Sequence, residues 1–328
     1  MVNSIKRTVG FSAWNTAFKL EKGRMNKLIL LRTKNAVLGR LFPDQVAKQA
    51  AQLFLTPRTH PQKTWEIDAE LQGTRVSFGE DLSAVIWGED GQPKVLLMHG
   101  WEGRATQLYA LAEPLVASGF QVIAIDAPQH GKSGGAQSHP VAFAKAILTA
   151  GKALGPFAGA VGHSMGGAAI AIAQANGLAL ESTVLIASPA RILDTLNAFA
   201  GFIGLPPGCT KHFIGHIEEK VGQPARNLDL VEIFSRLKPV TLLVHSQDDL
   251  EVPVQASEQL HNCCSTTDMV LMRGLGHRRI VRDAGVAECV SQFLQKHLLL
   301  TTVDTGTLKN PAGLEETSNT IEMIGTGE

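Results

Sequence analysis

The stretch Gly162-His163-Ser164-Met165-Gly166, followed by Gly167, says more about the fold than any other part of the chain. An apolar run, residues 157–161, leads into it, and a stretch of small residues, 166–175, leads out of it. This pattern predicts a strand, a sharp turn and a helix, because glycines let strand and helix pass closely at backbone angles that other residues avoid. A serine on such a turn points its hydroxyl clear of the edge of the sheet.

Length and charge limit the classes of protein to consider. The chain has 328 residues, 44% of them hydrophobic, which is enough for one large domain or two smaller ones. Thirty basic and thirty acidic residues cancel, so no net charge recruits nucleic acid. The charge is unevenly distributed, however, since residues 1–40 hold nine Lys or Arg and a single acid, Glu21. Such a basic arm is usually a solvated face, but with the apolar residues 28–31 and Phe42 it could also rest on a membrane surface.

The cysteines and the hydropathy pattern favour a cytoplasmic protein, with a peripheral position at the inner face of a membrane left open. Four cysteines at irregular spacing do not form a disulfide framework. No apolar run approaches the roughly 20 residues that cross a bilayer. The arginine-rich start is also typical of a transit peptide, but it lacks the serines of one.

Alternating apolar runs and helical patterns predict a mostly parallel sheet covered by helices on both faces. The runs that we assign to buried strands are 95–98, 122–125, 160–161, 184–187 and 240–244, and the helical patterns between them are 107–116, 141–154, 166–175 and 254–264. Residues 65–89 alternate apolar and polar side chains, which predicts antiparallel strands at the N-terminal edge of the sheet.

The same patterns divide the chain into three parts. Residues 1–60 are predicted to form a basic helical arm, and residues 61–300 an α/β domain. Within that domain, residues 190–237 interrupt the alternation with helical sequence, which predicts a small helical lid over the strand ends. Residues 301–328 are rich in Thr, Gly and acidic residues, so we expect an acidic, disordered tail there.

Further residues supply the partners that a nucleophilic serine needs. A serine hydroxyl reacts poorly unless a base takes its proton and a third group orients that base. Asp249 follows the predicted strand 240–244, and His277 lies in a glycine-bearing loop after the late apolar run 270–272. The order Ser164, Asp249, His277 is the order that accompanies a G-x-S-x-G turn of this kind. Asp248 is an alternative acid at this stage.

Two backbone N–H groups are candidates to bind a developing oxyanion. The N–H of Met165 lies at the start of the helix after Ser164, where the positive end of the helix adds to its effect. The N–H of Trp101 lies in the turn His99-Gly100-Trp101, directly after the predicted strand 95–98.

Taken together, these blocks make the chain resemble the α/β-hydrolase fold serine hydrolases over roughly residues 65–299. The oxyanion turn at His99, the loop 126–133, the turn at Ser164, and the acid and base loops at Asp249 and His277 all match the family pattern. The resemblance implies hydrolysis of carboxylic esters of small or medium acyl groups through an acyl-serine intermediate, without metal or other cofactor. The substrate implied is a small-molecule ester. Oligomeric state stays open.

Two departures from the pattern concern the site directly. Gln129 stands where the loop 126–133 has its first glycine in the family. The bulky Trp101 beside the oxyanion turn is expected to contact the substrate and to narrow the acyl side, and His163 is a further candidate for substrate contact or support.

Three other interpretations remain beside this one. The same triad could act on thioesters or amides, or form peracids. The fold could also serve a non-catalytic binding protein, although no member of the triad is missing. Cys209, His212 and His216 have the spacing of metal ligands, but no fourth ligand is evident, so we expect no metal site.

Overall fold

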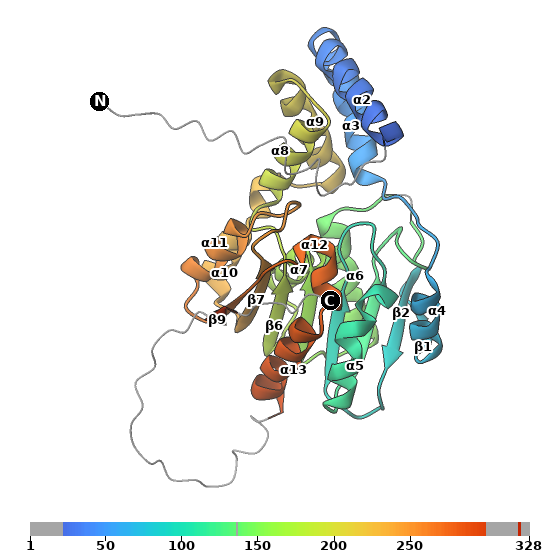
Figure 1. Ribbon diagram of the computed structural model, residues 1–328, viewed down its shortest axis with the longest axis vertical. Coiled ribbons are helices and arrows are strands. Elements are labelled where there is room, and N and C mark those ends of the chain that lie inside the picture. The colour runs from blue at the N-terminus through green and yellow to red at the C-terminus, as the bar shows by residue number, and fades with distance from the viewer. Residues whose placement is uncertain (1–21, 136, 300–320, 323–328) are drawn as a thin grey trace, which may run out of the picture.

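A computed structural model describes residues 22–135, 137–299 and 321–322. Its helices and strands alternate along the chain (Figure 1). The helices are α2 (Lys22–Leu41), α3 (Pro43–Leu55), α4 (Thr64–Leu71), α5 (Tyr109–Ala117), α6 (Pro140–Ala153), α7 (Met165–Ala175), α8 (Ile192–Phe202), α9 (Pro207–Val221), α10 (Leu230–Leu237), α11 (Gln255–Cys263), α12 (Gly276–Arg279) and α13 (Ala284–Leu298), with short 3₁₀ turns η1 (Ala105–Leu108), η2 (Ala225–Asn227) and η3 (Ile280–Arg282). The strands are β1 (Thr74–Phe78), β2 (Leu82–Trp87), β3 (Lys94–Met98), β4 (Gln121–Asp126), β5 (Gly159–His163), β6 (Ser182–Ile186), β7 (Thr241–Ser246), β8 (Thr267–Met272) and β9 (Ile321–Glu322).

The strands of the described residues form one sheet in the order β1-β2-β4-β3-β5-β6-β7-β8-β9. β1, β2 and β4 pair antiparallel, and every later pairing is parallel. The predicted fold class, a mostly parallel sheet with antiparallel strands at the N-terminal edge, is therefore confirmed. The strand order reverses direction around β3, and the loops at the carboxyl ends of β3 and β5 meet there, which is where ligands bind in open α/β sheets.

Helices cover both faces of the sheet because the central strands are apolar on both sides. In β3, Leu96 and Met98 belong to one buried cluster, whereas Val95 and Leu97 belong to another on the opposite face. The first cluster also contains residues of α6 and α7, and the second contains residues of α5 and α13. The continuous apolar runs in the sequence arise from this burial on both faces.

One predicted element is wrong. The alternation that predicted strand from residue 65 onward belongs, up to residue 71, to helix α4. The side chain of Glu66 accepts the backbone N–H of Lys63 at 2.6 Å, which caps the first turn of the helix. Ala69 is buried, and its carbonyl accepts the indole N–H of Trp87 in β2 at 2.9 Å. Capping and this tertiary contact therefore outweigh the local alternation of apolar and polar residues.

Helices α2, α3, α8 and α9 form a layer above the carboxyl ends of the strands, which we call the helical cap (Figure 1). α3 packs on α9, and its buried side chains belong to the same apolar cluster as those of α6 and α7. α3, which lies within the predicted arm 1–60, is therefore part of the apolar core. The buried residues of α3 are Val46, Ala47, Ala50, Ala51 and Leu55.

The two ends of the chain are described in part. Residues 1–21 of the predicted arm lie outside the described residues, as does the predicted acidic tail apart from residues 321–322. These two residues form β9, which pairs parallel with β8. Among the helices of the described residues, none combines the length and the apolar character needed to cross a membrane.

Candidate active site

Ser164 lies at the tip of the turn between β5 and α7, with φ of 53° and ψ of −122°. Such a positive φ is costly for a non-glycine residue and is typical of functional sites. Two glycines make the turn possible. A Cβ on Gly162 would lie 2.5 Å from the Gly167 backbone, and one on Gly166 would lie 2.3 Å from the carbonyl oxygen of Met98. The G-x-S-x-G pattern is thus explained by backbone contacts on both sides of Ser164.

The structure brings Ser164, His277 and Asp249 into one hydrogen-bonded chain. His277 Nε2 lies 2.9 Å from Ser164 Oγ, and His277 Nδ1 lies 2.7 Å from Asp249 Oδ2. The side chain of Asp249 is fully buried, and that of His277 is 8% exposed. Three residues that are far apart in the sequence thus have the geometry in which a histidine takes a proton from a serine and a carboxylate orients the histidine.

The two adjacent aspartates take different positions. Asp249 Oδ1 accepts the backbone N–H groups of Glu251 and Val252 at 2.8 and 2.9 Å, which leaves Oδ2 facing His277. Asp248 instead accepts the N–H of Gly274 at 2.9 Å and so ties down the loop that carries His277. Of the two acids that the sequence left open, Asp249 is the one whose carboxylate contacts His277.

His245, at the end of β7, is a contact of Asp249 that sequence reasoning missed. This histidine is completely buried, and its Nε2 lies 3.4 Å from Asp249 Oδ2 and 2.9 Å from the carbonyl of Val252. Its Nδ1 lies 2.7 Å from Ser257 Oγ, which can donate to it. Burial acts to raise the pKa of Asp249, but the hydrogen bonds from His245 and His277 outweigh it and hold that pKa well below its ordinary value. The signal in the sequence is a histidine four residues before the acid.

The turn after β3 is held by the ring of His99. Its Nε2 accepts the N–H of Ala127 at 3.0 Å, so its Nδ1 carries the proton and donates to the carbonyl of Gly100 at 2.7 Å. Gly103 N–H donates to the same carbonyl. Because C=O and N–H point in opposite directions across a trans peptide, fixing this carbonyl also fixes the direction of the Trp101 N–H. Burial lowers the pKa of His99 well below its ordinary value, so the neutral ring keeps this role.

This turn lies directly beside the serine. A Cβ on Gly100 would be only 3.0 Å from the Cβ of Ser164. The Met165 N–H is the first of helix α7. Within the described part of the chain, neither this N–H nor that of Trp101 donates to another protein group. Two unengaged donors near a serine hydroxyl are the elements from which an oxyanion hole is built.

The carboxylate of Asp126 fixes the loops behind this turn. It is buried and accepts the N–H groups of Ala105 at 2.8 Å and Lys132 at 3.0 Å, and it pairs with Arg75 at 2.6 Å. The loop 126–133 therefore has a scaffolding role. Gln129, which replaces a glycine of the family pattern, has a φ of 61°. Glycine adopts this conformation readily, but for glutamine it is strained.

His163 supports the base. Its Nε2 donates to the backbone carbonyl of His277 at 2.8 Å, and the centroids of the two rings are 4.8 Å apart. Desolvation lowers the pKa of His163 to about 3, and the neighbouring His277 ring acts in the same direction. His163 therefore stays neutral and holds the position of the histidine loop. Substrate contact by His163 stays a prediction.

Aromatic rings from the helical cap reach the site. Phe54 of α3 stacks on Trp101, with centroids 6.2 Å apart and planes 16° apart, and it packs edge-on against Phe199 of α8 and Phe213 of α9. His130 packs edge-on on the other side of Trp101 at 5.2 Å. The wall above the oxyanion turn thus includes a residue of the N-terminal arm, a contact that the sequence pattern alone did not indicate.

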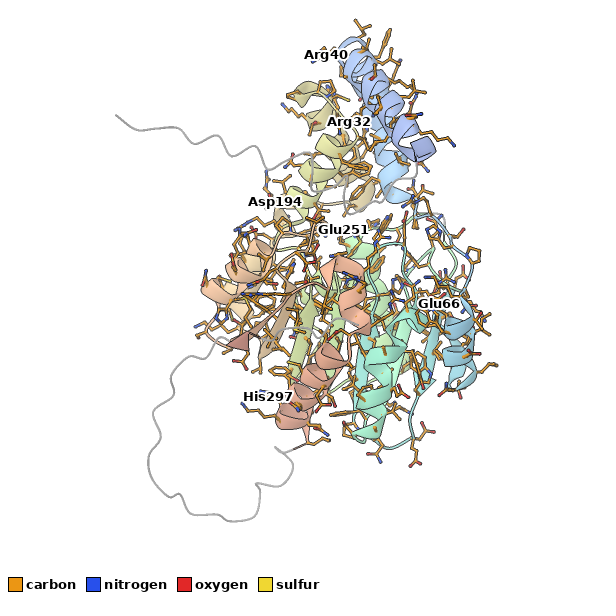
Figure 2. All side chains as sticks on the ribbon, in the orientation of Figure 1. Arg32, Arg40, Glu66, Asp194, Glu251 and His297 are labelled. Carbon is orange, nitrogen blue, oxygen red and sulfur yellow. The ribbon has the colours of Figure 1, made fainter. Side chains whose placement is uncertain are left out.

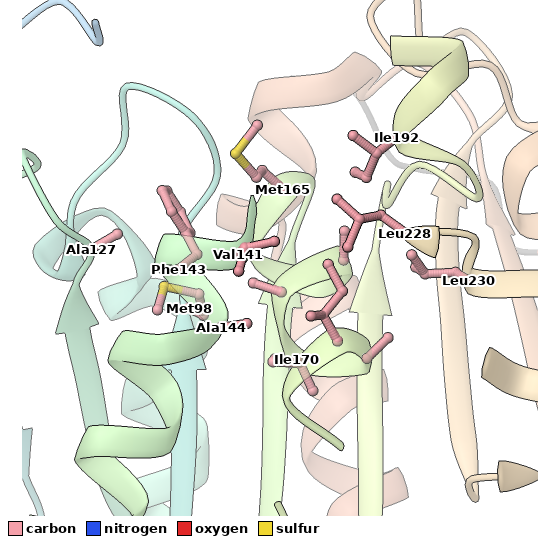
Figure 3. Close-up of a cluster of buried hydrophobic side chains, with 14 of the residues drawn as sticks. Met98, Ala127, Val141, Phe143, Ala144, Met165, Ile170, Ile192, Leu228 and Leu230 are labelled. Atoms are coloured by element: carbon pink, nitrogen blue, oxygen red, sulfur yellow. The ribbon is translucent and has the colours of Figure 1, made fainter. Parts of the chain in front are cut away.

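A small apolar pocket lies between the cap and the sheet. Its volume is about 10 Å³, roughly the space of one water molecule, and its lining includes Phe54, Pro140, Ile192 and Leu228. Ile192 and Leu228 belong to the same buried apolar cluster as Met165, the residue after Ser164 (Figure 3). The residue next to Ser164 therefore belongs to an apolar core that continues into the cap.

The candidate metal ligands on α9 do not converge. Cys209 is buried, and its thiol donates to the carbonyl of Pro43 at 3.3 Å. His216 Nε2 lies 2.8 Å from Asp44 Oδ1, and His212 approaches the same carboxylate at 3.5 Å. Among the residues that the structure describes, no three or more such side chains form a group that could hold a metal ion.

Comparisons with known proteins agree with the fold. The model of the alpha/beta hydrolase family matches residues 95–289. The chain belongs to this family. A comparison with curated proteins gave no match.

Solved structures of similar fold include several esterases and lipases. Est1E from Butyrivibrio proteoclasticus, solved with ferulic acid bound, is 18% identical over 69% of this chain and 99% of its own, with a TM-score of 0.57. The Pyrococcus furiosus esterase Pf2001 is 19% identical over 74% of this chain and 99% of its own, with a TM-score of 0.56. A membrane phospholipase A, described as a bacterial virulence factor, is 19% identical over 84% of this chain and 99% of its own, with a TM-score of 0.54. At these identities the likeness shows the fold.

Proposed function

We propose that this protein is a serine hydrolase that cleaves carboxylic esters of small or medium acyl groups. The observation that carries the proposal is the chain of hydrogen bonds from Ser164 Oγ to His277 and from His277 to the buried Asp249. The serine lies on a strained turn beside two unengaged backbone donors, as a nucleophile requires. The esterases among the structures of similar fold are consistent with ester chemistry.

In the proposed reaction, Ser164 Oγ attacks the ester carbonyl while its proton passes to His277 Nε2. The carbonyl oxygen becomes an oxyanion, which accepts hydrogen bonds from the N–H groups of Met165 and Trp101. His277 then gives its proton to the alcohol as the ester bond breaks, leaving an acyl group on Ser164. Water then attacks this acyl group while its proton passes to His277, and His277 returns a proton to Ser164 Oγ as the bond to the acyl group breaks and the carboxylic acid leaves. Asp249 holds the histidine and stabilises its charged form throughout.

The apolar pocket beneath the cap supports a limited acyl group. Phe54, Ile192 and Leu228 line this small pocket, and Phe54 also stacks on Trp101 beside the oxyanion turn. Each methylene that such a pocket can bury contributes about 0.8 kcal/mol, and further methylenes contribute nothing once the space is filled. The limited space beneath the cap therefore favours esters of small or medium acyl groups.

The proposed reaction uses only side chains and backbone groups of the chain, so it invokes no cofactor or metal. All four cysteines are free thiols, which supports a reducing, cytoplasmic location.

A panel of p-nitrophenyl esters from acetyl to palmitoyl tests this function, with matched thioesters beside it. The proposal predicts that kcat/KM peaks at short or medium chains and falls beyond them. A kcat/KM that rises up to palmitoyl would point to a lipase, and a clear preference for thioesters would point to a thioesterase. Absence of turnover across both panels, with folded protein, would favour a binding protein on this fold.

A further inference from the structure

Exposed apolar side chains are concentrated at the outer side of the helical cap. Among the described residues, nine large hydrophobic side chains are exposed, and five of them lie between residues 29 and 42. Scattered single exposures are normal on a protein surface, but such a concentration in fourteen residues marks an interaction surface. The five, with their exposed fractions, are Ile29 (56%), Leu30 (70%), Val37 (53%), Leu41 (65%) and Phe42 (52%).

Most of these side chains share one face of α2. Leu30, Lys34, Val37 and Leu41 are spaced at i, i+4, i+7 and i+11, so they lie on one face of the helix. α2 packs on α3 and α9, and on the side away from this row the buried Asn35 donates from its side chain to the carbonyl of Ile203, directly after α8, at 2.8 Å. α2 is therefore fixed with its apolar row of side chains turned away from the protein.

Basic side chains lie within this row and beside it. Lys27, Lys34 and Arg40 are exposed, and the chain has no acidic residue between Lys22 and Pro43. Figure 2 shows Arg40 near the outer end of the cap. Residues 1–42 hold nine basic residues and one acid, a formal charge of +8, so the rest of this neutral chain carries −8. A helix face with exposed leucines beside lysine and arginine is suited to the interface of an anionic bilayer.

We propose that the exposed face of α2 docks on an anionic lipid surface, with Leu30, Val37 and Leu41 entering the headgroup region and Lys27, Lys34 and Arg40 pairing with lipid phosphates. A second copy of the chain is a poorer occupant, because two faces of the same positive charge repel each other. Docking in this way turns the cap toward the membrane and leaves the sheet on the far side (Figure 1). The inference does not depend on the proposed ester hydrolysis.

Sedimentation of the full chain with vesicles tests the proposal. Phosphatidylcholine vesicles with and without phosphatidylglycerol are compared at low and high salt. We expect binding to the mixed vesicles that is weakened by salt and is at least about tenfold weaker on pure phosphatidylcholine. Lys27→Gln, Lys34→Gln and Arg40→Gln combined should weaken binding to mixed vesicles by about 10²-fold. The same changes at Lys145, Lys152 and Lys296, which are exposed on α6 and α13, should leave it within about twofold.

A second set of variants tests the apolar row. Leu30→Gln, Val37→Gln and Leu41→Gln combined should weaken binding at least about tenfold, because each side chain then loses its burial in the lipid. Leu71→Gln is the control, since Leu71 is 79% exposed on α4. Equal binding to both vesicle types, or unchanged binding of both α2 variants, would overturn the proposal. The proposal would also be overturned if the protein did not sediment with vesicles and instead formed a dimer that the combined Leu30, Val37 and Leu41 variant converts to a monomer. Should the apolar variant fail to fold, the charge variant alone decides.

Discussion

Replacing Asp249 with asparagine should abolish hydrolysis while leaving the fold intact. The asparagine oxygen can keep the hydrogen bonds from the N–H groups of Glu251 and Val252, so the loop keeps its conformation. The amide nitrogen then faces His277 Nδ1 at the position now occupied by Oδ2, 2.7 Å away. Because this nitrogen donates, Nδ1 must accept, and the ring proton moves to Nε2. In that tautomer His277 presents an N–H to Ser164 and cannot take its proton.

The expected loss follows from this change of tautomer. An asparagine in the position of the orienting acid lowers kcat by about 10⁴-fold, which corresponds to about 5.4 kcal/mol of transition-state stabilisation. The measurement is kcat/KM for a short p-nitrophenyl ester, with the midpoint of urea unfolding measured alongside as a check on the fold.

Asp248→Asn is the matched control. Its oxygen can still accept the N–H of Gly274, so we expect less than about a tenfold loss of activity and a small loss of stability. If Asp249→Asn kept more than a few per cent of wild-type activity, or if Asp248→Asn were the inactive variant, the assignment of the acid would be refuted.

Three further changes probe the surroundings of the site. In the folded protein the pKa of His163 is about 3, whereas in the unfolded chain it is about 6.5. Between these two pH values the unfolded chain binds a proton that the folded protein does not, so lowering the pH favours unfolding. His163→Gln should therefore make the free energy of urea unfolding fall less steeply between pH 6 and 4, by up to about 1.4 kcal/mol per pH unit, and an unchanged slope would contradict the cited pKa. Trp101→Ala should shift the ester optimum to longer acyl chains, with about a fourfold gain in kcat/KM per additional buried methylene, and an unmoved optimum would show that the ring does not limit the pocket. Gly166→Ala should destabilise the protein by about 1–3 kcal/mol in urea unfolding, because the new Cβ would lie 2.3 Å from the carbonyl oxygen of Met98. A variant as stable as the wild type would show that the turn can accommodate a Cβ.

The sheet was predictable because its central strands are buried on both faces. Continuous apolar runs are the direct consequence of that burial, and β3, β4, β6 and β7 each include such a run. α4 was predicted as strand because its eight residues also alternate in polarity, and this alternation does not by itself distinguish a short helix from a strand. Its identity depends on the cap at Glu66 and on the Trp87 contact, which only the folded chain creates.

The geometry of the site was predictable to the extent that each group occupies a loop of recognisable pattern. Ser164, Asp249 and His277 each follow a strand, and the parallel sheet gathers the carboxyl ends of those strands at one edge. The contact of Phe54 with Trp101 joins residues 47 positions apart and follows no short motif. The contact of His245 with Asp249 was missed for a different reason. A histidine four residues before an acid indicates a contact only where both side chains are buried, and their burial becomes known only from the fold.

Covalent labelling with a fluorophosphonate, followed by mass spectrometry, tests the central claim most directly. The reagent phosphonylates a serine only where a base activates the hydroxyl and donors stabilise the oxyanion, and it requires no knowledge of the natural substrate. The structure predicts one phosphonyl adduct per chain, on the peptide that contains Ser164, with loss of ester hydrolysis in step with labelling and no adduct in Ser164→Ala. An unlabelled wild-type protein, or an adduct that persists on another residue in Ser164→Ala, would contradict it.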